Sequence, residues 1–225
     1  MTFDPFGDFE TRGYLRNAAG EKDPARIRRL EHGAFRAGLP PALSALRSRP
    51  TLTYDDVLAT HRHQFGAMYP WAGQDRALIL PDQAIGRGGR FDLFAHPGQI
   101  RRAIDHALRL GQDAATMRQR PGEVLGYLSH AHPFLEGNGR TLLTVHSELA
   151  RRAGMHIAWE HVGKAEYLAA LTRELEQPGT ALDALLAQHV RPGALDLRQI
   201  RRGLETNPNL GSPEVRRPSP LPGKD

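Results

Sequence analysis

A short glycine-rich segment between two amphipathic stretches constrains the fold of this chain more than any other part of it. Residues 132–140 read HPFLEGNGR. An apolar-periodic stretch precedes them over 121–131, and a second one follows over 140–153. The two glycines that flank Asn138 can adopt backbone conformations that other residues avoid. The pattern predicts two helices joined by a tight loop of defined shape.

Helical periodicity recurs along most of the chain and predicts a mainly α fold. Gly38, followed by Pro40 and Pro41, supplies the expected end of the first helix. Thr53 and Asp56 form a variant of the capping box, so that a second helix is expected to begin there and to continue through Phe65. The first helix is expected over residues 24–37. The other expected helices lie at 97–111, 121–131, 140–153, 164–176 and 181–190.

One region departs from helical periodicity. Residues 77–80 are a short apolar run, residues 86–89 offer turn chemistry, and residues 90–94 alternate polar and apolar side chains. This arrangement predicts a small β-hairpin on an otherwise helical bundle.

The composition favours one domain with extensions. The chain has 225 residues, of which 40% are hydrophobic, and this suits a single sizeable core. We expect a helical N-terminal extension over 1–50 that packs on the core, a main domain over 51–195, and a flexible tail over 196–225. The tail is expected because prolines recur in it, at positions 208, 213, 218, 220 and 222.

Charge and cysteine content narrow the expected environment and partners. The formal net charge is +5 and the pI is about 9.9, but the arginines are interleaved with acidic residues. A nucleic-acid partner is therefore not expected. Cysteine is absent, and we see neither a secretory signal nor a membrane span, so the cytoplasm is the expected compartment and no membrane is expected as a partner.

The 132–140 segment has the parts of a phosphate-binding site. Backbone N–H groups of Gly137, Asn138 and Gly139 can converge at the start of the following helix, where the helix dipole also favours an anion. Arg140 carries a planar fork that suits phosphate oxygens. Glu136 would repel a phosphate unless a cation lay between them, as Mg²⁺ does with one carboxylate and substrate oxygens.

His132 completes this set, because its ordinary pKa suits removal of a hydroxyl proton near neutral pH. Phe134 is expected to anchor the loop in the core. A base, a metal carboxylate, a ring of N–H donors and an arginine are the parts that phosphoryl transfer requires. Taken alone, His132 could cap the preceding helix and the glycines could form an ordinary turn. The combination at this spacing is much more specific.

The segment resembles the motif of the Fic (filamentation induced by cAMP) proteins, which reads His, any residue, Phe, any residue, Asp or Glu, Gly, Asn, Gly, Arg, two further residues and a second Arg. Residues 132–140 match this motif without a gap. The resemblance extends to residues 69–76 (YPWAGQDR), to residues 88–91 (GGRF), and to residues 7–15 (GDFETRGYL), so that it covers roughly residues 3 to 195.

The resemblance implies a Fic-type helical bundle with a hairpin flap that transfers AMP from ATP-Mg²⁺ to a Ser, Thr or Tyr hydroxyl of a target protein. It implies that His132 is the general base and that Glu136 holds Mg²⁺. It further implies a phosphate cradle that ends in Arg140, and a flap that aligns the target protein by edge-strand pairing. The implied donor-binding set comprises Phe134, Gly137, Asn138, Gly139 and Arg140 together with Gly88 and Gly89, and Asn138 and Arg140 join His132 and Glu136 as implied catalytic residues.

Two departures from the family pattern stand out. Leu143 occupies the position of the second Arg, which family members use on the terminal phosphate, and it reads more simply as helix packing. The chain also lacks the Ser/Thr-x-x-x-Glu-Gly/Asn motif through which many members inhibit themselves. Family members without this motif are commonly toxins restrained by a small separate antitoxin, or effectors delivered into another cell. The resemblance therefore implies one of these two roles.

Several alternatives stay open at this stage. Leu143 leaves room for another nucleotidyl donor such as CDP-choline, or for a degenerate Fic domain that only binds. A metal hydrolase could use histidines, but i and i+2 residues diverge on helices. Aromatic residues could stack on nucleic-acid bases, although core or flap anchoring is the simpler interpretation. The histidines concerned are His61, His63, His130 and His132, and the aromatic residues are Trp71, Phe91 and Phe94.

Overall fold

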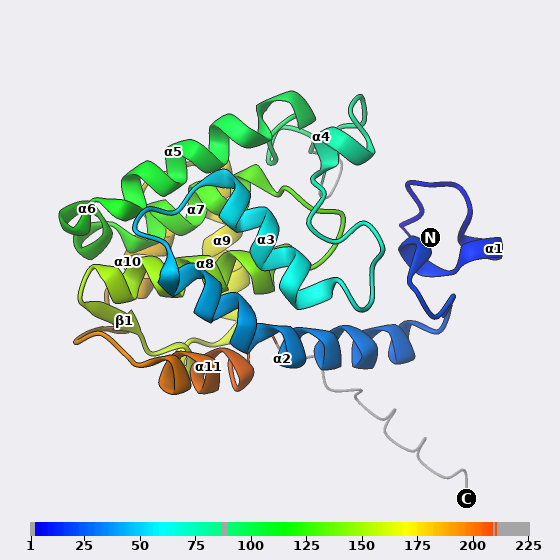
Figure 1. Cartoon of the computed structure of the whole chain (residues 1–225). Coiled ribbons are helices and arrows are strands. Elements are labelled where there is room, and N and C mark those ends of the chain that lie inside the picture. Colours follow the sequence, from blue (N-terminus) through cyan, green and yellow to red (C-terminus); the bar gives the residue numbers. More distant parts are fainter. Residues whose placement is uncertain (1–2, 87–89, 209, 211–225) are drawn as a thin grey trace, which may run out of the picture.

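A 25-residue helix, α2 (Pro24–Ser48), runs along one side of the molecule (Figure 1). It begins at Asp23, whose carboxylate accepts a hydrogen bond from the Ala25 N–H at 2.8 Å, and Pro24 occupies the first turn. The computed structural model describes residues 3–86, 90–208 and 210. A short helix, α1 (Phe9–Arg12), and a 3₁₀ turn, η1 (Tyr14–Arg16), precede α2.

Helix α2 continues through Pro40 and Pro41, so the expected end near residue 37 is wrong. Each proline in a helix interior costs about 3 kcal/mol. The residues on the inward face offset this cost, because each fully buried large apolar side chain stabilises the fold by about 1.5–3 kcal/mol. Gly38 shows how close the packing is, since a Cβ there would lie 2.0 Å from the His63 carbonyl oxygen on α3 (Tyr54–Phe65). The buried inward-facing residues of α2 include Phe35, Leu39, Leu43 and Leu46.

The other helices follow the sequence pattern more closely. Thr53 and Asp56 form the expected capping box, with the Thr53 N–H donating to the Asp56 carboxylate at 2.9 Å. Two further helices have the expected bounds, α7 (Pro121–Ala131) and α9 (Lys164–Glu176). Further elements are a 3₁₀ turn η2 (Pro97–Gln99), α5 (Ile100–Gln112), α6 (Ala114–Gln119), α8 (Asn138–Arg152), a 3₁₀ turn η3 (Trp159–His161) and α10 (Ala181–Leu186). Helix α10 ends before residue 190, where its end was expected.

Helix α8 is the central element of the bundle. It packs against α7, α3, α2 and α5, which surround it in Figure 1. Leu142, Val145 and Leu149 are buried on it, as the sequence pattern predicts, and Thr141 and Thr144 are buried as well. The loop between α7 and α8 is therefore held by two helices of the core, and this gives its backbone a fixed frame.

The expected strand at residues 77–80 is wrong, because this segment forms a short helix, α4 (Arg76–Ile79). Asp75 caps it, and its carboxylate accepts the Leu78 N–H at 3.0 Å. In the described parts of residues 77–94, only Arg90 has β-type pairing, as an isolated bridge. Gly88 and Gly89, at the expected turn, lie outside the described residues. The strands that the structure does describe are β1 (Met155–Ile157) and β2 (Val190–Pro192), paired antiparallel with Met155 opposite Pro192.

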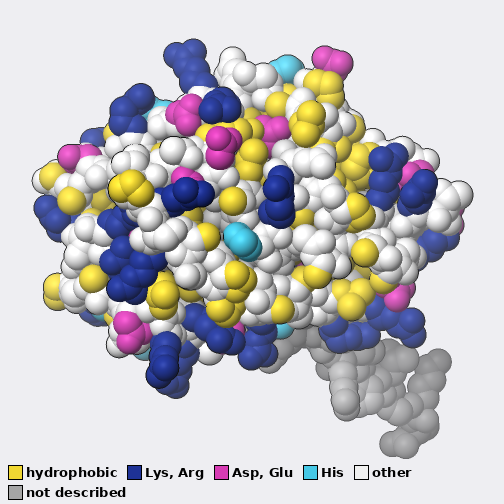
Figure 2. Space-filling model, viewed as in Figure 1, with side chains coloured by type: hydrophobic (Ala, Val, Ile, Leu, Met, Phe, Trp, Pro, Cys, Tyr) yellow, Lys and Arg dark blue, Asp and Glu magenta, His cyan; other side chains and the backbone are white. Residues whose placement is uncertain are grey.

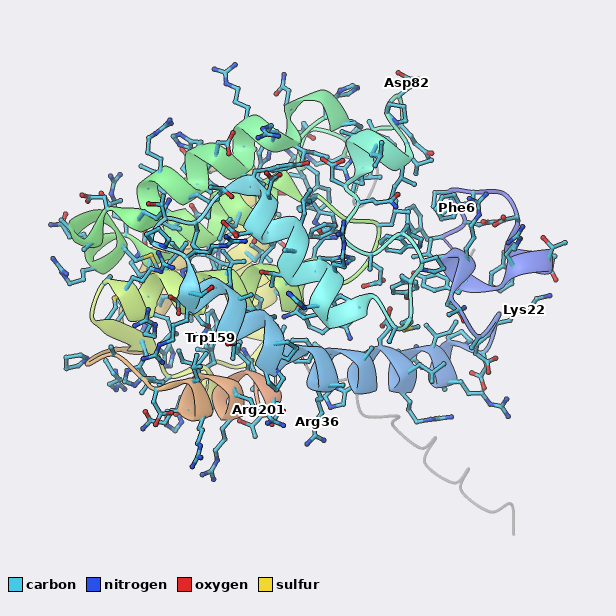
Figure 3. The ribbon with its side chains drawn as sticks, in the orientation of Figure 1. Phe6, Lys22, Arg36, Asp82, Trp159 and Arg201 are labelled. Atoms are coloured by element: carbon cyan, nitrogen blue, oxygen red, sulfur yellow. The ribbon has the colours of Figure 1, made fainter. Side chains whose placement is uncertain are left out.

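Residues 197–205 form a packed helix, α11 (Leu197–Glu205), where the sequence led us to expect a flexible tail from residue 196. Its capping box pairs Asp196 with Gln199, and Ile200 and Leu204, one turn apart, are buried. The Glu205 carboxylate lies 2.8 Å from Arg201 Nε and 3.9 Å from Arg36 Nε on α2. Figure 3 labels both arginines at this junction of α2 and α11. The cap and the two buried apolar residues explain why a packed helix forms beyond residue 196.

The surface mixes both signs of charge, as the sequence predicts. On the face shown in Figure 2, Lys and Arg side chains lie at many places with Asp and Glu among them. Within the part of the chain that the structure describes, no helix is long and apolar enough to cross a membrane.

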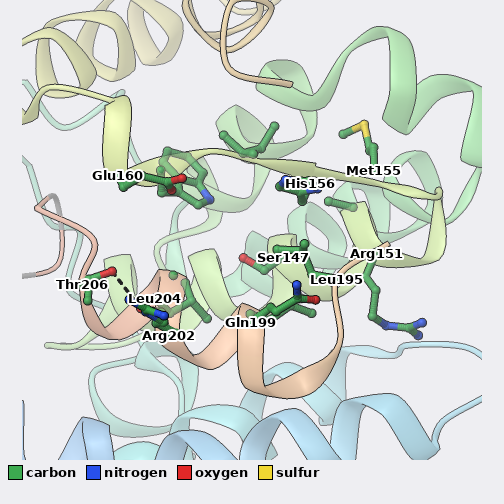
Figure 4. A pocket seen from close by; sticks show the side chains of 15 residues that line it. Ser147, Arg151, Met155, His156, Glu160, Leu195, Gln199, Arg202, Leu204 and Thr206 are labelled. Carbon is green, nitrogen blue, oxygen red and sulfur yellow. Dashed lines mark hydrogen bonds between the residues drawn. The ribbon is translucent and has the colours of Figure 1, made fainter. Parts of the chain in front are cut away.

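A cavity of about 440 Å³ lies between α8, β1 and α11 (Figure 4). Its walls include Ser147 from α8, Met155 from β1 and Gln199 from α11. Ser147 is seven residues after Arg140 on the same helix, which at 1.5 Å per residue places it roughly 10 Å along the axis. The cavity is thus distinct from the α7–α8 loop.

Buried histidines give the fold a predictable pH dependence. His146 on α8 is fully buried, its Nε2 lies 2.8 Å from the Pro121 carbonyl oxygen, and burial lowers its pKa to about 4. In the unfolded chain His146 has an ordinary pKa near 6.5. Between pH 6.5 and about 4 it is therefore protonated in the unfolded chain but neutral in the folded chain. Stability contributed by neutral His146 is present above pH 6.5 and is lost as the pH falls.

We expect the free energy of unfolding of a His146→Gln variant to fall less steeply than that of the wild type over this window, by about 1.4 kcal/mol per pH unit. Glutamine keeps a donor for Pro121 but has no proton to gain. Urea unfolding at pH 7.5, 6.5, 5.5 and 4.5 measures both slopes. Equal slopes would show that His146 is protonated in the folded state as readily as in the unfolded one.

Candidate functional site

Two left-handed residues shape the loop between α7 and α8. His132 ends α7 with φ of 39°, and Gly137 precedes α8 with φ of 80°. Such a φ is common for glycine but rare for histidine, and non-glycine residues held there are frequent at functional sites. Between them Phe134 is fully buried, as the sequence predicts for an anchor.

The Asn138 side chain closes the loop internally. Its Oδ1 accepts the Phe134 N–H at 2.9 Å, and its Nδ2 donates to the Phe134 carbonyl oxygen at 2.7 Å. Both polar atoms of the amide are therefore committed to the backbone, and the side chain is almost completely buried. What Asn138 can offer an anion is its backbone N–H, while its side chain fixes the shape of the loop.

The first turn of α8 presents free donors. The first hydrogen bond within this turn runs from the Thr141 N–H to the Gly137 carbonyl oxygen at 3.0 Å. The N–H groups of Asn138, Gly139 and Arg140 come before it and are the unpaired donors that every helix has at its start. Gly139 is exposed, and a Cβ built on it would meet no atom within 4 Å. An anion can thus approach this backbone closely.

Arg140 lies between two carboxylates. Its Nη2 donates to Glu31 Oε2 on α2 at 3.1 Å and lies 3.9 Å from Glu136 Oε1. Tyr69 donates its hydroxyl proton to Glu31 at 2.5 Å, and Tyr14 donates to Glu136 at 3.3 Å. The guanidinium is therefore held at the mouth of the loop by the N-terminal part of the chain, and a bound phosphate would share it with Glu31.

The charges of this cluster suit a cation as a further component. Burial, and next the neighbouring Glu31 carboxylate, raise the pKa of Glu136. Two carboxylates share one arginine here, which leaves an excess of one negative charge when both are ionised. The Glu136 side chain remains 35% exposed, so a cation could reach it from solvent. A single carboxylate beside substrate oxygens is a usual Mg²⁺ environment.

His132 is neutral at physiological pH. Burial, and next the positive charge of Arg76, lower its pKa to about 3, against a weaker opposing effect of a hydrogen bond with the Ser129 backbone. Its ring packs on Phe94, with ring centroids 4.1 Å apart. A neutral imidazole can accept a proton, and the residue thus meets the first requirement for the base expected from the sequence.

His61 is part of the site, although the sequence singled it out only as a possible ligand in the alternative metal site. The Gly73 N–H donates to its Nδ1 at 2.9 Å, so the ring proton lies on Nε2, which donates to the Glu136 carbonyl oxygen at 3.0 Å. The ring stacks on Phe134 at 3.8 Å, and burial lowers the pKa of His61 to about 3. His61 thus holds the backbone of the loop at Glu136.

Other contacts to the site come from distant positions that no local pattern reveals. Glu31, Tyr14 and Tyr69 are separated from the loop by more than sixty residues, and Arg76 binds its backbone. Residues 7–15 and 69–76 are the segments whose resemblance to the family was noted from the sequence. Tyr14 lies in the first of these segments and Tyr69 and Arg76 lie in the second, whereas Glu31 lies in neither and no signal in the sequence pointed to it.

The histidines do not form a metal site among the described residues, where no group of three or more His, Cys, Asp or Glu could hold an ion. His61 and His132 use their rings in the contacts above, and His130 Nδ1 lies 3.0 Å from the Leu93 carbonyl oxygen. Of the three aromatic residues considered for base stacking, Trp71 is buried, Phe94 packs on His132, and Phe91 is 62% exposed.

Leu143 is in the core, with 1% of its surface exposed. We expect Leu143→Arg to lower the free energy of unfolding by roughly 3 kcal/mol or more, because it replaces a buried leucine with a larger, charged side chain. Leu143→Met, which conserves volume, is the matched control and is expected to cost less than about 1.5 kcal/mol. Urea unfolding measures both. A Leu143→Arg protein of normal stability that binds triphosphates more tightly would show instead that this position faces the donor.

Known proteins resemble this chain at both the sequence and the fold level. The family model described as Fic/DOC family matches residues 51–150. The protein adenylyltransferase VbhT of Bartonella schoenbuchensis is 34% identical over 189 residues, covering 83% of this chain and 39% of the relative. The probable protein adenylyltransferase y4lH of Sinorhizobium fredii is 30% identical over 169 residues, covering 71% of this chain and 82% of the relative. The chain therefore spans about two fifths of VbhT and most of y4lH.

Solved structures share the fold at lower identity. The BepC protein of Bartonella tribocorum, solved with AMPPNP, superposes with a TM-score of 0.62 at 20% identity, covering 78% of this chain and 91% of that one. The N-terminal Fic domain of a Bartonella quintana effector, solved with ADP, gives a TM-score of 0.62 at 22% identity, covering 81% and 92%. The helical architecture, the motif at residues 132–140 and these relatives agree, and the chain belongs to the Fic/DOC family.

Proposed function

We propose that this protein transfers AMP from ATP to a Ser, Thr or Tyr hydroxyl of a target protein. The observation that carries the proposal is the α7–α8 loop, in which one backbone holds a neutral histidine, free helix N-terminal donors, an arginine and a partly exposed carboxylate. Relatives of similar sequence are named protein adenylyltransferases, which supports the same chemistry here.

The proposed reaction assigns a task to each part of the loop. The target hydroxyl oxygen forms a bond to the α-phosphorus, the bond from phosphorus to the pyrophosphate oxygen breaks, and the hydroxyl proton passes to His132. The N–H groups at the start of α8 and the Arg140 guanidinium stabilise the charge on the phosphates. A weakly basic imidazole suffices, because the transition state of phosphoryl transfer is loose and bound phosphates would raise the His132 pKa.

Glu136 would hold Mg²⁺ in this proposal. The ion would supply neutralisation of the charge on the departing phosphates. His61 would fix the position of the Glu136 carboxylate through its hydrogen bond to the Glu136 backbone. Asn138 would fix the N–H donors at the start of α8 through its two hydrogen bonds to the Phe134 backbone.

The buried position of Leu143 favours a second candidate function. The side chain that family members use on the terminal phosphate is here a core leucine, so the far end of a triphosphate must be held by other groups. A Fic-type transferase with another nucleotidyl donor, such as CDP-choline, needs no such group. A degenerate domain that binds nucleotide without turnover remains the non-enzymatic alternative.

The partners follow from this chemistry. We propose that the target protein docks beside α4 and the segment that follows it, and that a small antitoxin protein could restrain the activity, because the chain carries no inhibitory motif of its own. Action in another cell after delivery would fit the translocated effectors among the structural relatives, and action in the bacterial cytoplasm is the alternative.

The test is a labelling experiment. The protein is incubated with lysate and with labelled ATP, CTP, GTP, UTP or CDP-choline, with and without Mg²⁺, beside the His132→Ala variant. Mg²⁺-dependent label from ATP on a protein, lost in the variant, supports AMP transfer. Label from another donor supports the second candidate, and no His132-dependent label from any donor refutes a transferase.

A further inference from the structure

Arg76 is a fully buried arginine at the start of α4. Burial of a guanidinium is expensive unless it is fully paired. In the described part of the chain its hydrogen bonds go to carbonyl oxygens rather than to a carboxylate, and its Nη1 is buried without a hydrogen-bond partner. Asp75, the neighbouring acid, instead caps α4 and accepts the Tyr54 hydroxyl proton. Burial of the Arg76 charge without an ion pair lowers stability, which suggests that the residue serves the site rather than the stability of the fold.

Two of its hydrogen bonds go to the residues at the end of α7, beside the His132 side chain. The Arg76 Nε donates to the His132 carbonyl oxygen at 2.8 Å, and the Arg76 backbone N–H donates to the Pro133 carbonyl oxygen at 2.7 Å. These carbonyls belong to two consecutive peptide planes directly after the left-handed His132. Both planes are thereby fixed, and with them the direction in which the loop leaves α7.

The same guanidinium also fixes the ring that packs on His132. Its Nη2 donates to the Ala95 carbonyl oxygen at 2.8 Å. The Ala95 N–H in turn donates to the His130 carbonyl oxygen at 2.8 Å, at the end of α7. Ala95 is therefore clamped between α4 and α7, and its neighbour Phe94 is held with its ring 4.1 Å from that of His132.

We propose that Arg76 is a positioning residue, which sets the orientation of the His132 imidazole through the backbone of residues 132–133 and through Phe94. Its side chain has no exposed surface, so it acts through these contacts. The proposal rests on the transferase function above, with His132 as the base. The planar fork is essential, because a lysine ammonium cannot reach two carbonyl oxygens in the fixed directions that a guanidinium serves.

The test compares Arg76→Lys with wild type in three measurements. The rate constant kcat for labelling is expected to fall by about 10²-fold, the effect of a displacement of about 1 Å at a reacting group. The dissociation constant for ADP-Mg²⁺ is expected to change by less than about threefold, because the start of α8 and Arg140 are untouched. The His132 ring signal in a ¹H–¹³C spectrum is expected to shift, while that of His146 stays in place.

Two further variants make the outcome decisive. Arg118→Lys is the matched control, since Arg118 also donates to a backbone carbonyl at a helix end, Ala153 at 3.0 Å, but far along the chain from the loop. It should leave kcat and the His132 signal unchanged. If Arg76→Lys does not fold, Phe94→Leu removes the ring contact without touching a buried charge, and a shifted His132 signal with a lower kcat is expected.

An unchanged His132 signal in the folded variants would overturn the proposal, and so would equal losses in kcat and in ADP affinity, which indicate a general structural role. The ring signal keeps this test separate from that of the proposed function. If no donor labels any protein, the signal still reports whether Arg76 orients His132.

Discussion

Replacing His132 with alanine is expected to lower the rate of AMP transfer by about 10²–10⁴-fold, the usual contribution of a positioned general base. The donor should still bind, because the N–H groups at the start of α8 and Arg140 do not depend on the imidazole. The dissociation constant for ADP-Mg²⁺ is therefore expected to stay within about threefold of wild type. Single-turnover labelling from the preferred donor measures the rate, and calorimetry measures the binding.

His63→Ala is the matched control for this prediction. His63 is exposed on α3, and the sequence alone left it open as a partner of His132 in a metal site. If His63→Ala lowers the rate as much as His132→Ala does, the two histidines act together and the base assignment is wrong. A His132→Ala protein with the wild-type rate would equally contradict it.

The sequence was most informative where local signals agree with packing. Pro121 opens α7 and Lys164 opens α9 as predicted, and the Thr53 cap begins α3. The sequence also singled out the whole 132–140 loop, because its glycines, its helix start and its polar side chains all depend on residues close together in the chain.

Two of the errors arise where tertiary contacts override a local signal. Pro40 and Pro41 predict a helix end, but the apolar face around them is buried by α3 and α8. Residues 77–80 form an apolar run that suits a strand, yet Asp75 caps a helix there and Arg76 is drawn inward by three carbonyl oxygens. Neither the burial of the α2 face nor the long-range contacts of Arg76 is visible in a window of neighbouring residues.

The same limit applies to the site. His61 hydrogen-bonds to Glu136 across 75 positions of the chain, and Glu31 pairs with Arg140 across 109. Contacts of this kind fix the positions of the Arg140 guanidinium and of the Glu136 backbone. The sequence predicts the chemical groups of the loop, and the long-range contacts determine their geometry and charge.

Gly137→Ala is expected to have the second large effect, on stability and donor binding together. A Cβ at Gly137 would lie 2.6 Å from Phe65 Cε2, and the backbone φ of 80° is unfavourable for alanine. The strain costs roughly 1–3 kcal/mol. Phe65 cannot move alone, because the Arg140 guanidinium lies 4.9 Å above its ring and His61 lies 5.0 Å to its side.

A Cβ at Gly137 should therefore displace Phe65 together with Arg140, which is proposed to bind the donor. We expect the Gly137→Ala variant to bind ADP-Mg²⁺ at least about tenfold more weakly than wild type, since a displacement of Arg140 removes a charged hydrogen bond worth about 1.5–3 kcal/mol. Urea unfolding and calorimetry on the same preparation separate the two losses. Wild-type affinity in a destabilised variant would show that the loop relaxes without moving Arg140.

Gly139→Ala is the matched comparison for Gly137→Ala, because it adds the same methyl group two residues further along the loop. Gly139 has no atom within 4 Å of a built Cβ and lies in the first turn of α8, where alanine is favoured over glycine by about 0.5–1 kcal/mol. Its stability should match or exceed that of wild type. If its affinity for ADP-Mg²⁺ nevertheless falls, the space beside Gly139 is occupied by the donor, and the two glycines have different tasks: Gly137 permits the turn, and Gly139 leaves room for phosphate.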